Sequence, residues 1–308
     1  MIARLLRTVT LSAAVFALAW VWLAWQLGTP WLAVLGLLLV LALQAGVLGL
    51  EFLFALNVHR TDPAPRPSVG QILRAWVGEC RASQRVFGWW QPWRSTTEPD
   101  CSALAGRRGI VFVHGYFCNR GVWLPWLARC RARGVPFIAP TLEPAFGSID
   151  DYAPIIDAAV ARLERETGIA PLIVAHSMGG LAVRAWWAAT PGAAARVHRV
   201  FTIGTPHRGT WLARFGITRN AMQMRIGSPW MGACDARVDV LTSFAARCTC
   251  VFSHTDNIVF PPSNAVLAGA RAIHIAATGH VALADHPEVV SEVESWLGVD
   301  ATVAVSRD

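Results

Sequence analysis

The first sixty residues are almost uniformly apolar, and the pattern changes sharply after them. Residues 8–27 carry no charge, and residues 31–56 carry only Glu51. A helix needs about 20 residues to cross a bilayer, so each segment is long enough. Between them, residues 28–30 read Gly-Thr-Pro, which breaks a helix. The pattern predicts a transmembrane helical hairpin in residues 1–60, with helices at about 8–27 and 31–56.

A secretory signal peptide is the competing interpretation of this region. It requires a short apolar core followed by a small-residue cleavage site, whereas here a second, longer apolar segment follows the first. Positive charges flank the two segments and are absent from the turn, so the positive-inside rule places both ends and the rest of the chain in the cytoplasm. The flanking residues are Arg4, Arg7, His59, Arg60 and Arg66. Glu51 lies near the inner end of the second helix, where we expect it to reach the interface.

Beyond a proline-rich linker at residues 61–68, short apolar runs alternate with amphipathic stretches. We predict an early strand at residues 85–93, a buried strand at 109–113, and strands at 136–140, 171–175, 199–203, 248–253 and 271–275. We predict helices at residues 71–84, 121–133, 149–167, 178–190 and 287–297. This alternation is typical of parallel strands covered on both faces. The predicted fold class is α/β, with a doubly wound, mostly parallel sheet forming a domain over residues 69–308.

Composition narrows the classes of function. The net charge is +7, and all 27 basic residues are arginines. They are scattered rather than clustered, so we expect no nucleic-acid partner, and a membrane surface fits the charge better. The seven cysteines are irregularly spaced and include no CxxC motif, so we expect neither a zinc site nor a disulfide framework.

A candidate nucleophile lies where a predicted strand meets a predicted helix. Residues 175–180 read AHSMGG, which matches the nucleophile-elbow pattern G-x-S-x-G with alanine in the first position. The turn is so sharp that small residues must flank the serine. We therefore predict that Ser177 is exposed above the sheet as a nucleophile.

A nucleophilic serine needs a base, and the base needs an orienting acid. His280 follows the last predicted strand, and Asp256 directly follows the strand before it. Both lie at the edge of the sheet where Ser177 is expected, in the chain order Ser, Asp, His. His274 is expected to pack in the core and His286 to cap the terminal helix, while Asp235 and Asp239 precede their strand.

The reaction also needs donors for an oxyanion. One is expected to be the backbone N–H of Met178, after the nucleophile. The other is expected from the loop after residues 109–113, with Tyr116 as the first choice and Phe117 as the alternative. The side chain of His114 in that loop is expected to be structural.

These motifs together resemble the α/β-hydrolase superfamily and, within it, bacterial lipases and esterases of the triacylglycerol lipase type. VHGY at residues 113–116, AHSMGG at 175–180 and GTPHRGT at 204–210 carry the resemblance, which covers about residues 109–297. Ala175 departs from the commonest elbow. The resemblance implies a lid over residues 211–240.

We therefore expect a serine hydrolase that cleaves carboxylic esters, with a lipid or other acyl ester as substrate, no cofactor and no metal. The hairpin would hold it in a bacterial inner membrane. A thioesterase or amidase could use the same triad, because pocket shape determines the scissile group. A non-catalytic, lipid-binding scaffold is the alternative from another class. The sequence leaves the oligomeric state open.

Overall fold

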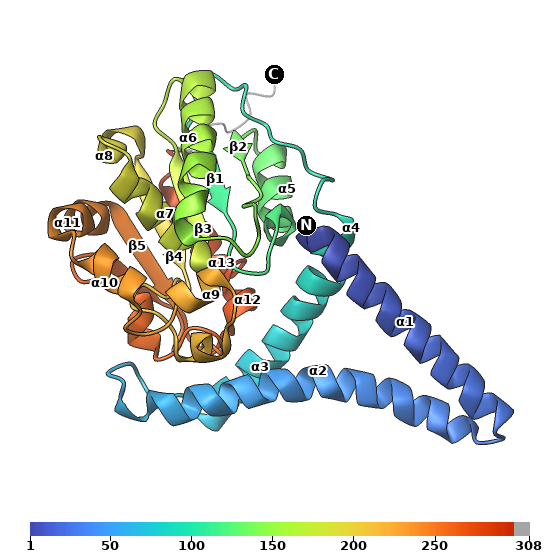
Figure 1. The fold of residues 1–308 in the computed structure, drawn as a ribbon. Coiled ribbons are helices and arrows are strands. Elements are labelled where there is room, and N and C mark those ends of the chain that lie inside the picture. The colour runs from blue at the N-terminus through green and yellow to red at the C-terminus, as the bar shows by residue number, and fades with distance from the viewer. Residues whose placement is uncertain (299–308) are drawn as a thin grey trace, which may run out of the picture.

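The computed structural model describes residues 1–298 and contains a six-stranded, wholly parallel sheet in the order β2-β1-β3-β4-β5-β6 (Figure 1). The strands are β1 Ile110–Val113, β2 Phe137–Ile138, β3 Leu172–His176, β4 Arg199–Ile203, β5 Cys248–Phe252 and β6 Arg271–His274. The predicted α/β class is confirmed, and the sheet is consistent with an α/β-hydrolase fold. The last ten residues of the predicted domain, 299–308, lie outside the described residues.

The helices follow the predicted alternation. They are α1 Ile2–Gln26, α2 Pro30–Val58, α3 Val69–Ser83, α4 Gln91–Trp93, α5 Leu124–Ala132, α6 Ala153–Thr167, α7 Met178–Ala189, α8 Ala193–Arg196, α9 Arg219–Gln223, α10 Pro229–Asp235, α11 Val238–Arg247, α12 His280–Leu283 and α13 Pro287–Ser295. Short 3₁₀ turns span His59–Thr61, Arg120–Trp123, Ile149–Tyr152, Trp211–Phe215 and Pro262–Ala265.

Apolar cores cover both faces of the central strands, which explains why β1 is a continuous apolar run, whereas the edge strand β6 is mostly exposed. Alternate residues of β1 point to opposite faces. Val111 and Val113 pack toward α6 and α7, whereas Ile110 and Phe112 pack toward α5 and α13. All four are buried, and burying one such side chain is worth about 1.5–3 kcal/mol.

The order of the strands fixes where a binding site can lie. From β1 the chain passes to β2 on one side, and then crosses back to β3 and builds the sheet in the other direction. In open α/β sheets, ligands bind at the carboxyl ends of the strands where the order reverses. Here that point lies between β1 and β3, whose next residues include His114, Gly115 and Ser177.

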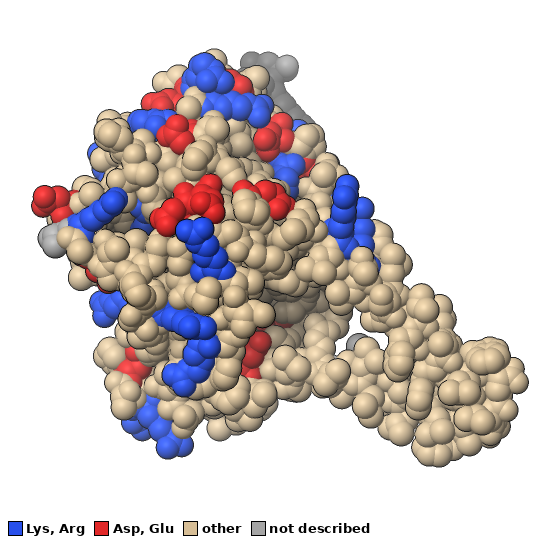
Figure 2. Space-filling view, viewed as in Figure 1, with Lys and Arg blue, Asp and Glu red and all other residues tan. Residues whose placement is uncertain are grey.

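The N-terminal helices α1 and α2 project away from the sheet as a hairpin (Figure 1). Figure 2 shows the projecting end without visible charge, in agreement with the sequence. By length and composition, both helices could cross a membrane, and a signal sequence would meet the same criterion.

The second half of α2 packs on the rest of the protein. Leu48 and Phe52 are buried, and the ring of Phe54 lies 5.4 Å from that of Trp211. The indole of Trp76 in α3 donates a hydrogen bond of 2.8 Å to the carbonyl of Ala45. The end of the hairpin therefore belongs to the same packed unit as the sheet.

Two predictions differ from the structure in this region. The early strand at residues 85–93 is wrong, because this segment forms a π-helix at Gln84–Trp90 followed by α4. Val86 and Trp90, one helical turn apart, both pack against the core, so a helical period replaces the strand that their aromatic and β-branched character suggested. Glu51 does not reach outward to an interface: it turns toward the domain and bonds Asn257.

Candidate active site

Ser177 occupies a strained turn between β3 and α7. Its φ is 57° and its ψ is −131°, a region that costs a non-glycine residue about 1–3 kcal/mol. The N–H of Ser177 donates to the carbonyl of Ile203 at 2.8 Å, which fixes the turn against β4. The side chain is held at the N-terminus of α7, where the helix dipole favours negative charge.

Glycines make this turn possible because no side chain would fit beside it. A Cβ at Gly115, in the loop after β1, would lie 2.7 Å from the Cβ of Ser177. A Cβ at Gly179 would lie 2.5 Å from the carbonyl oxygen of Val113, and one at Gly180 would collide with Thr205. The loop after β1 is therefore pressed directly against Ser177, as the sequence pattern predicted.

Asp256 and His280 meet at the same edge of the sheet. Nδ1 of His280 lies 2.9 Å from Oδ2 of Asp256, and both residues are buried. The other carboxylate oxygen of Asp256 accepts hydrogen bonds of 2.8 Å from the N–H groups of Ile258 and Val259. These bonds fix the carboxylate so that it can hold the imidazole in one tautomer, with Nε2 free to accept a proton.

Burial lowers the pKa of His280, but the charge and hydrogen bond of Asp256 outweigh it, and Glu79 and Glu51 add to the increase. The net pKa lies above the ordinary value. The neighbouring His176 is the opposite case. Burial and the charge of His280 lower its pKa to about 3, so it stays neutral. Its Nε2 donates to the carbonyl of His280 at 3.0 Å.

Ser177 and His280 line one cavity of about 750 Å³. Its walls are mostly apolar and come from several parts of the chain. They include Val40, Leu43, Val47 and Leu48 of α2, Phe87, and Met224 from the segment expected to form a lid. The hairpin is therefore one wall of this cavity, which the sequence did not predict.

Of the predicted oxyanion donors, Met178 directly follows Ser177, and Tyr116 follows Gly115, whose backbone is pressed against Ser177. Within residues 1–298, the backbone N–H groups of Met178 and Tyr116 donate to no protein acceptor. His114 fixes the Tyr116 loop: its Nδ1 donates to the carbonyl of Gly115 at 3.0 Å, and its Nε2 accepts from the N–H of Leu142 at 2.9 Å. Its side chain supports the loop, as expected.

The other candidate residues have different partners. Asp235 pairs with Arg184, and His286 accepts a bond from the N–H of Glu288 at the start of α13. The expectation that His274 packs in the core is wrong. It is exposed on the edge strand β6, and its Nε2 lies 2.6 Å from Nδ1 of His254.

Sequence reasoning missed Glu79 and Asn257. The carboxylate of Glu79, from α3, accepts hydrogen bonds of 2.8–3.0 Å from the N–H groups of Val281 and Ala282. Oδ1 of the buried Asn257 accepts the N–H of His280 at 3.1 Å. Glu79 lies on an amphipathic helix, where a glutamate is usually exposed, so only the tertiary structure identifies its position.

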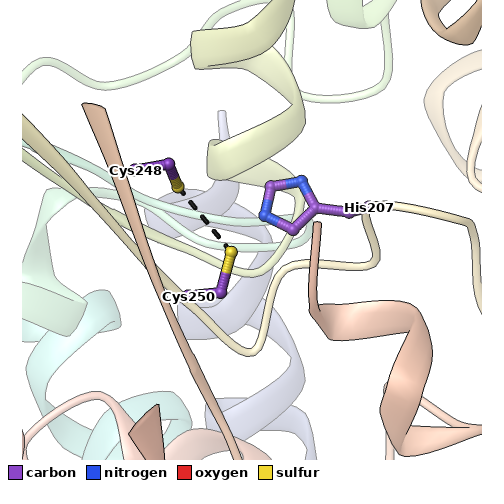
Figure 3. Close-up of side chains that lie close together, drawn as sticks. All are labelled: His207, Cys248 and Cys250. Carbon is purple, nitrogen blue, oxygen red and sulfur yellow. Dashed lines mark hydrogen bonds between the residues drawn. The ribbon is translucent and has the colours of Figure 1, made fainter. Parts of the chain in front are cut away.

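One buried cluster could hold a metal ion. Figure 3 shows His207 beside Cys248 and Cys250, and their donor atoms lie within 4.8 Å of one another. Both thiols lie on one side of β5, as expected, but His207 joins them from the loop after β4. The hydroxyl of Thr202 bonds Nε2 of His207 at 3.0 Å and the thiol of Cys248 at 3.6 Å. Nδ1 of His207 is buried and has no hydrogen-bond partner within residues 1–298, and none of the three residues lines the cavity beside Ser177.

Comparison with known proteins supports the fold. No protein-family model and no curated protein matches the chain. The mature form of the Bacillus licheniformis lipase BlEst2 matches with 18% identity and a TM-score of 0.54, over 62% of this chain and 92% of that chain. Aspergillus fumigatus lipase B matches with 15% identity and a TM-score of 0.52, over 58% of this chain and 49% of that chain. At these identities, the similarity to lipases shows a shared fold.

The buried Glu79 generates a prediction about stability. Burial raises its pKa to about 7, so the native state binds more protons than the unfolded chain between about pH 4.5 and 7. The free energy of unfolding should fall as pH rises through this window, by roughly 3 kcal/mol, and level off above it. Thermal unfolding midpoints of Glu79→Gln should lack this fall. The exposed Glu288→Gln serves as control and should follow the parent protein. If the thermal midpoint falls with pH equally in the parent protein and in Glu79→Gln, the prediction is wrong.

Proposed function

We propose that this protein is a serine hydrolase that cleaves carboxylic esters through an acyl-enzyme, with Ser177 as nucleophile, His280 as base and Asp256 as orienting acid. The observation that carries the proposal is the buried Asp256–His280 hydrogen bond of 2.9 Å at the cavity that Ser177 also lines. The strained turn that presents Ser177 supports it further.

The reaction follows from these positions. The hydroxyl oxygen of Ser177 attacks the ester carbonyl and passes its proton to Nε2 of His280, while Asp256 stabilises the imidazolium. The N–H groups of Met178 and Tyr116 bind the oxyanion, with Phe117 as the alternative to Tyr116. His280 then protonates the leaving alcohol, and a water molecule activated by the same imidazole releases the acid. Removal of one oxyanion donor typically costs a factor of about 10²–10³ in rate.

The apolar cavity favours a lipid or other acyl ester as substrate. Burying each methylene of an acyl chain gains about 0.8 kcal/mol. The helix that forms one wall of the cavity, α2, is also one of the two helices of the hairpin. We propose that α1 and α2 span a bacterial inner membrane, which would place the cavity beside the lipid. Residues 211–240 would act as a lid, since Ala213, Gly216 and Met224 already line the cavity.

The first test of this function is covalent labelling of the full-length protein with a fluorophosphonate probe. Ser177→Ala should abolish labelling and ester hydrolysis, while Asp256→Asn should lower kcat by about 10³–10⁴-fold because the imidazole loses its orientation. Ser291→Ala, at an exposed serine of α13, is the matched control. If Ser177→Ala is still labelled, another residue is the nucleophile. If the parent protein neither reacts with the probe nor turns over any ester, the non-catalytic scaffold is favoured.

The second test concerns the acyl chain. Specificity measured as kcat/KM on matched esters should rise at least tenfold from acetyl to octanoyl. Leu48→Trp, which fills the cavity from α2, should shift the optimum to shorter chains. Leu50→Trp, on the exposed side of the same helix, should not. Equal rates for all chain lengths would contradict a lipid substrate, and faster turnover of matched thioesters would favour the thioesterase.

The third test concerns topology. With both ends of the hairpin in the cytoplasm, protease added to intact spheroplasts should spare the domain, while protease added to inverted membrane vesicles should digest it. Digestion after detergent permeabilisation confirms that the protease is active. Cleavage of the domain in intact spheroplasts would place it on the opposite side of the membrane.

A further inference from the structure

Glu51 is the only charged residue between positions 8 and 58, and it points into the candidate active site. Its carboxylate lines the cavity that contains Ser177 and His280. Its Oε2 accepts a hydrogen bond of 2.7 Å from Nδ2 of Asn257. A carboxylate in an otherwise apolar helix is costly to retain, so its contact with this loop requires an explanation.

Asn257 connects this carboxylate to His280. The side chain is fully buried, with Nδ2 on Glu51 and Oδ1 accepting the N–H of His280 at 3.1 Å. Because a carboxylate only accepts and a backbone N–H only donates, the amide can satisfy both partners in one orientation alone. Asn257 also directly follows Asp256 in the chain, so the same loop carries both groups that face His280.

Glu79 holds the loop from its other side through the N–H groups of Val281 and Ala282. A Cβ at Gly279 would overlap its carboxylate, so the fit is close. The backbone before and after His280 is thus tied to two helices outside the sheet, α2 and α3. The ionisable groups that face the imidazole are Asp256, Glu51, Glu79 and His176.

We propose that Glu51 is a positioning residue for His280, acting through Asn257, so that the hairpin completes the active site as well as anchoring the protein. This inference rests on the proposed hydrolase function. Removal of the Glu51 carboxylate frees the amide of Asn257 to rotate and loosens the backbone that aims the imidazole at Ser177. Removal of the charge alone makes the imidazolium of His280 less favourable and lowers the pKa of that residue.

The experiment uses the full-length protein in detergent, a soluble short-chain ester and the variants Glu51→Ala and Glu51→Gln. Asn57→Ala is the matched control, because Asn57 is an exposed polar residue of the same helix, six positions after Glu51, and does not line the cavity. Glu51→Ala should lower kcat by about 10–100-fold with little change in KM, as expected for a misaimed catalytic group. Glu51→Gln keeps an acceptor for Asn257 and should recover most of this loss.

The pH profile separates positioning from a merely structural role. In Glu51→Gln, the acidic limb of kcat/KM should move to lower pH, because the imidazole that must be neutral now has a lower pKa. Asn57→Ala should leave both kcat and the acidic limb of the pH profile unchanged. Three results would each overturn the proposal: wild-type kcat in Glu51→Ala, equal losses of kcat in Glu51→Ala and Asn57→Ala, or an acidic limb that does not move in Glu51→Gln.

Ser177→Ala, assayed in parallel, distinguishes a wrong role for Glu51 from a wrong hydrolase assignment. If Ser177→Ala is inactive and Glu51→Ala is fully active, the hydrolase assignment stands and the role of Glu51 is wrong. If Ser177→Ala retains activity, the hydrolase assignment itself fails. Should Glu51→Ala not fold, as judged by its thermal midpoint, the rescue and pH shift in Glu51→Gln still decide the question.

Discussion

The close approach of β1 and β3 at their carboxyl ends is the constraint on which the rest of the site depends. Val113 and Ala175 are register partners, and the backbone beyond them has no space for side chains at Gly115, Gly179 or Gly180. This crowding forces Ser177 into its positive-φ turn and brings the Tyr116 loop against it. The turn is stable because the sheet on either side, buried on both faces, cannot relax to relieve it.

Around that turn, the protein gathers several carboxylates near one imidazole. Asp256 contacts His280 directly, while Glu79 and Glu51 approach from helices outside the sheet. In a poorly hydrated environment each negative charge favours the imidazolium. The arrangement therefore stabilises the protonated form of His280, which a proton-transfer reaction must pass through, while the burial of His176 keeps a competing positive charge away from the same position.

The sequence predicted what depends on local pattern and chain order. The strands, the turn at Ser177, and the positions of Asp256 and His280 after successive strands follow from apolar periodicity and short motifs. The contacts of Glu79 and Glu51 could not be predicted in this way, because each residue bonds to one about 200 positions away in the chain. The segment at residues 85–93 was misassigned for a related reason: its aromatic residues favour a strand locally, and packing against the core makes them helical.

The packing of α2 has a consequence for handling the protein. A shortened chain beginning at Val69 would be an obvious way to obtain a soluble domain, since the sheet and its helices all follow that position. It would also remove one wall of the cavity, exposing Phe87 and Met224 to water and leaving Asn257 without its carboxylate partner. Poor solubility or low activity of such a fragment would then reflect an opened active site, and would say little about whether the intact molecule is an enzyme.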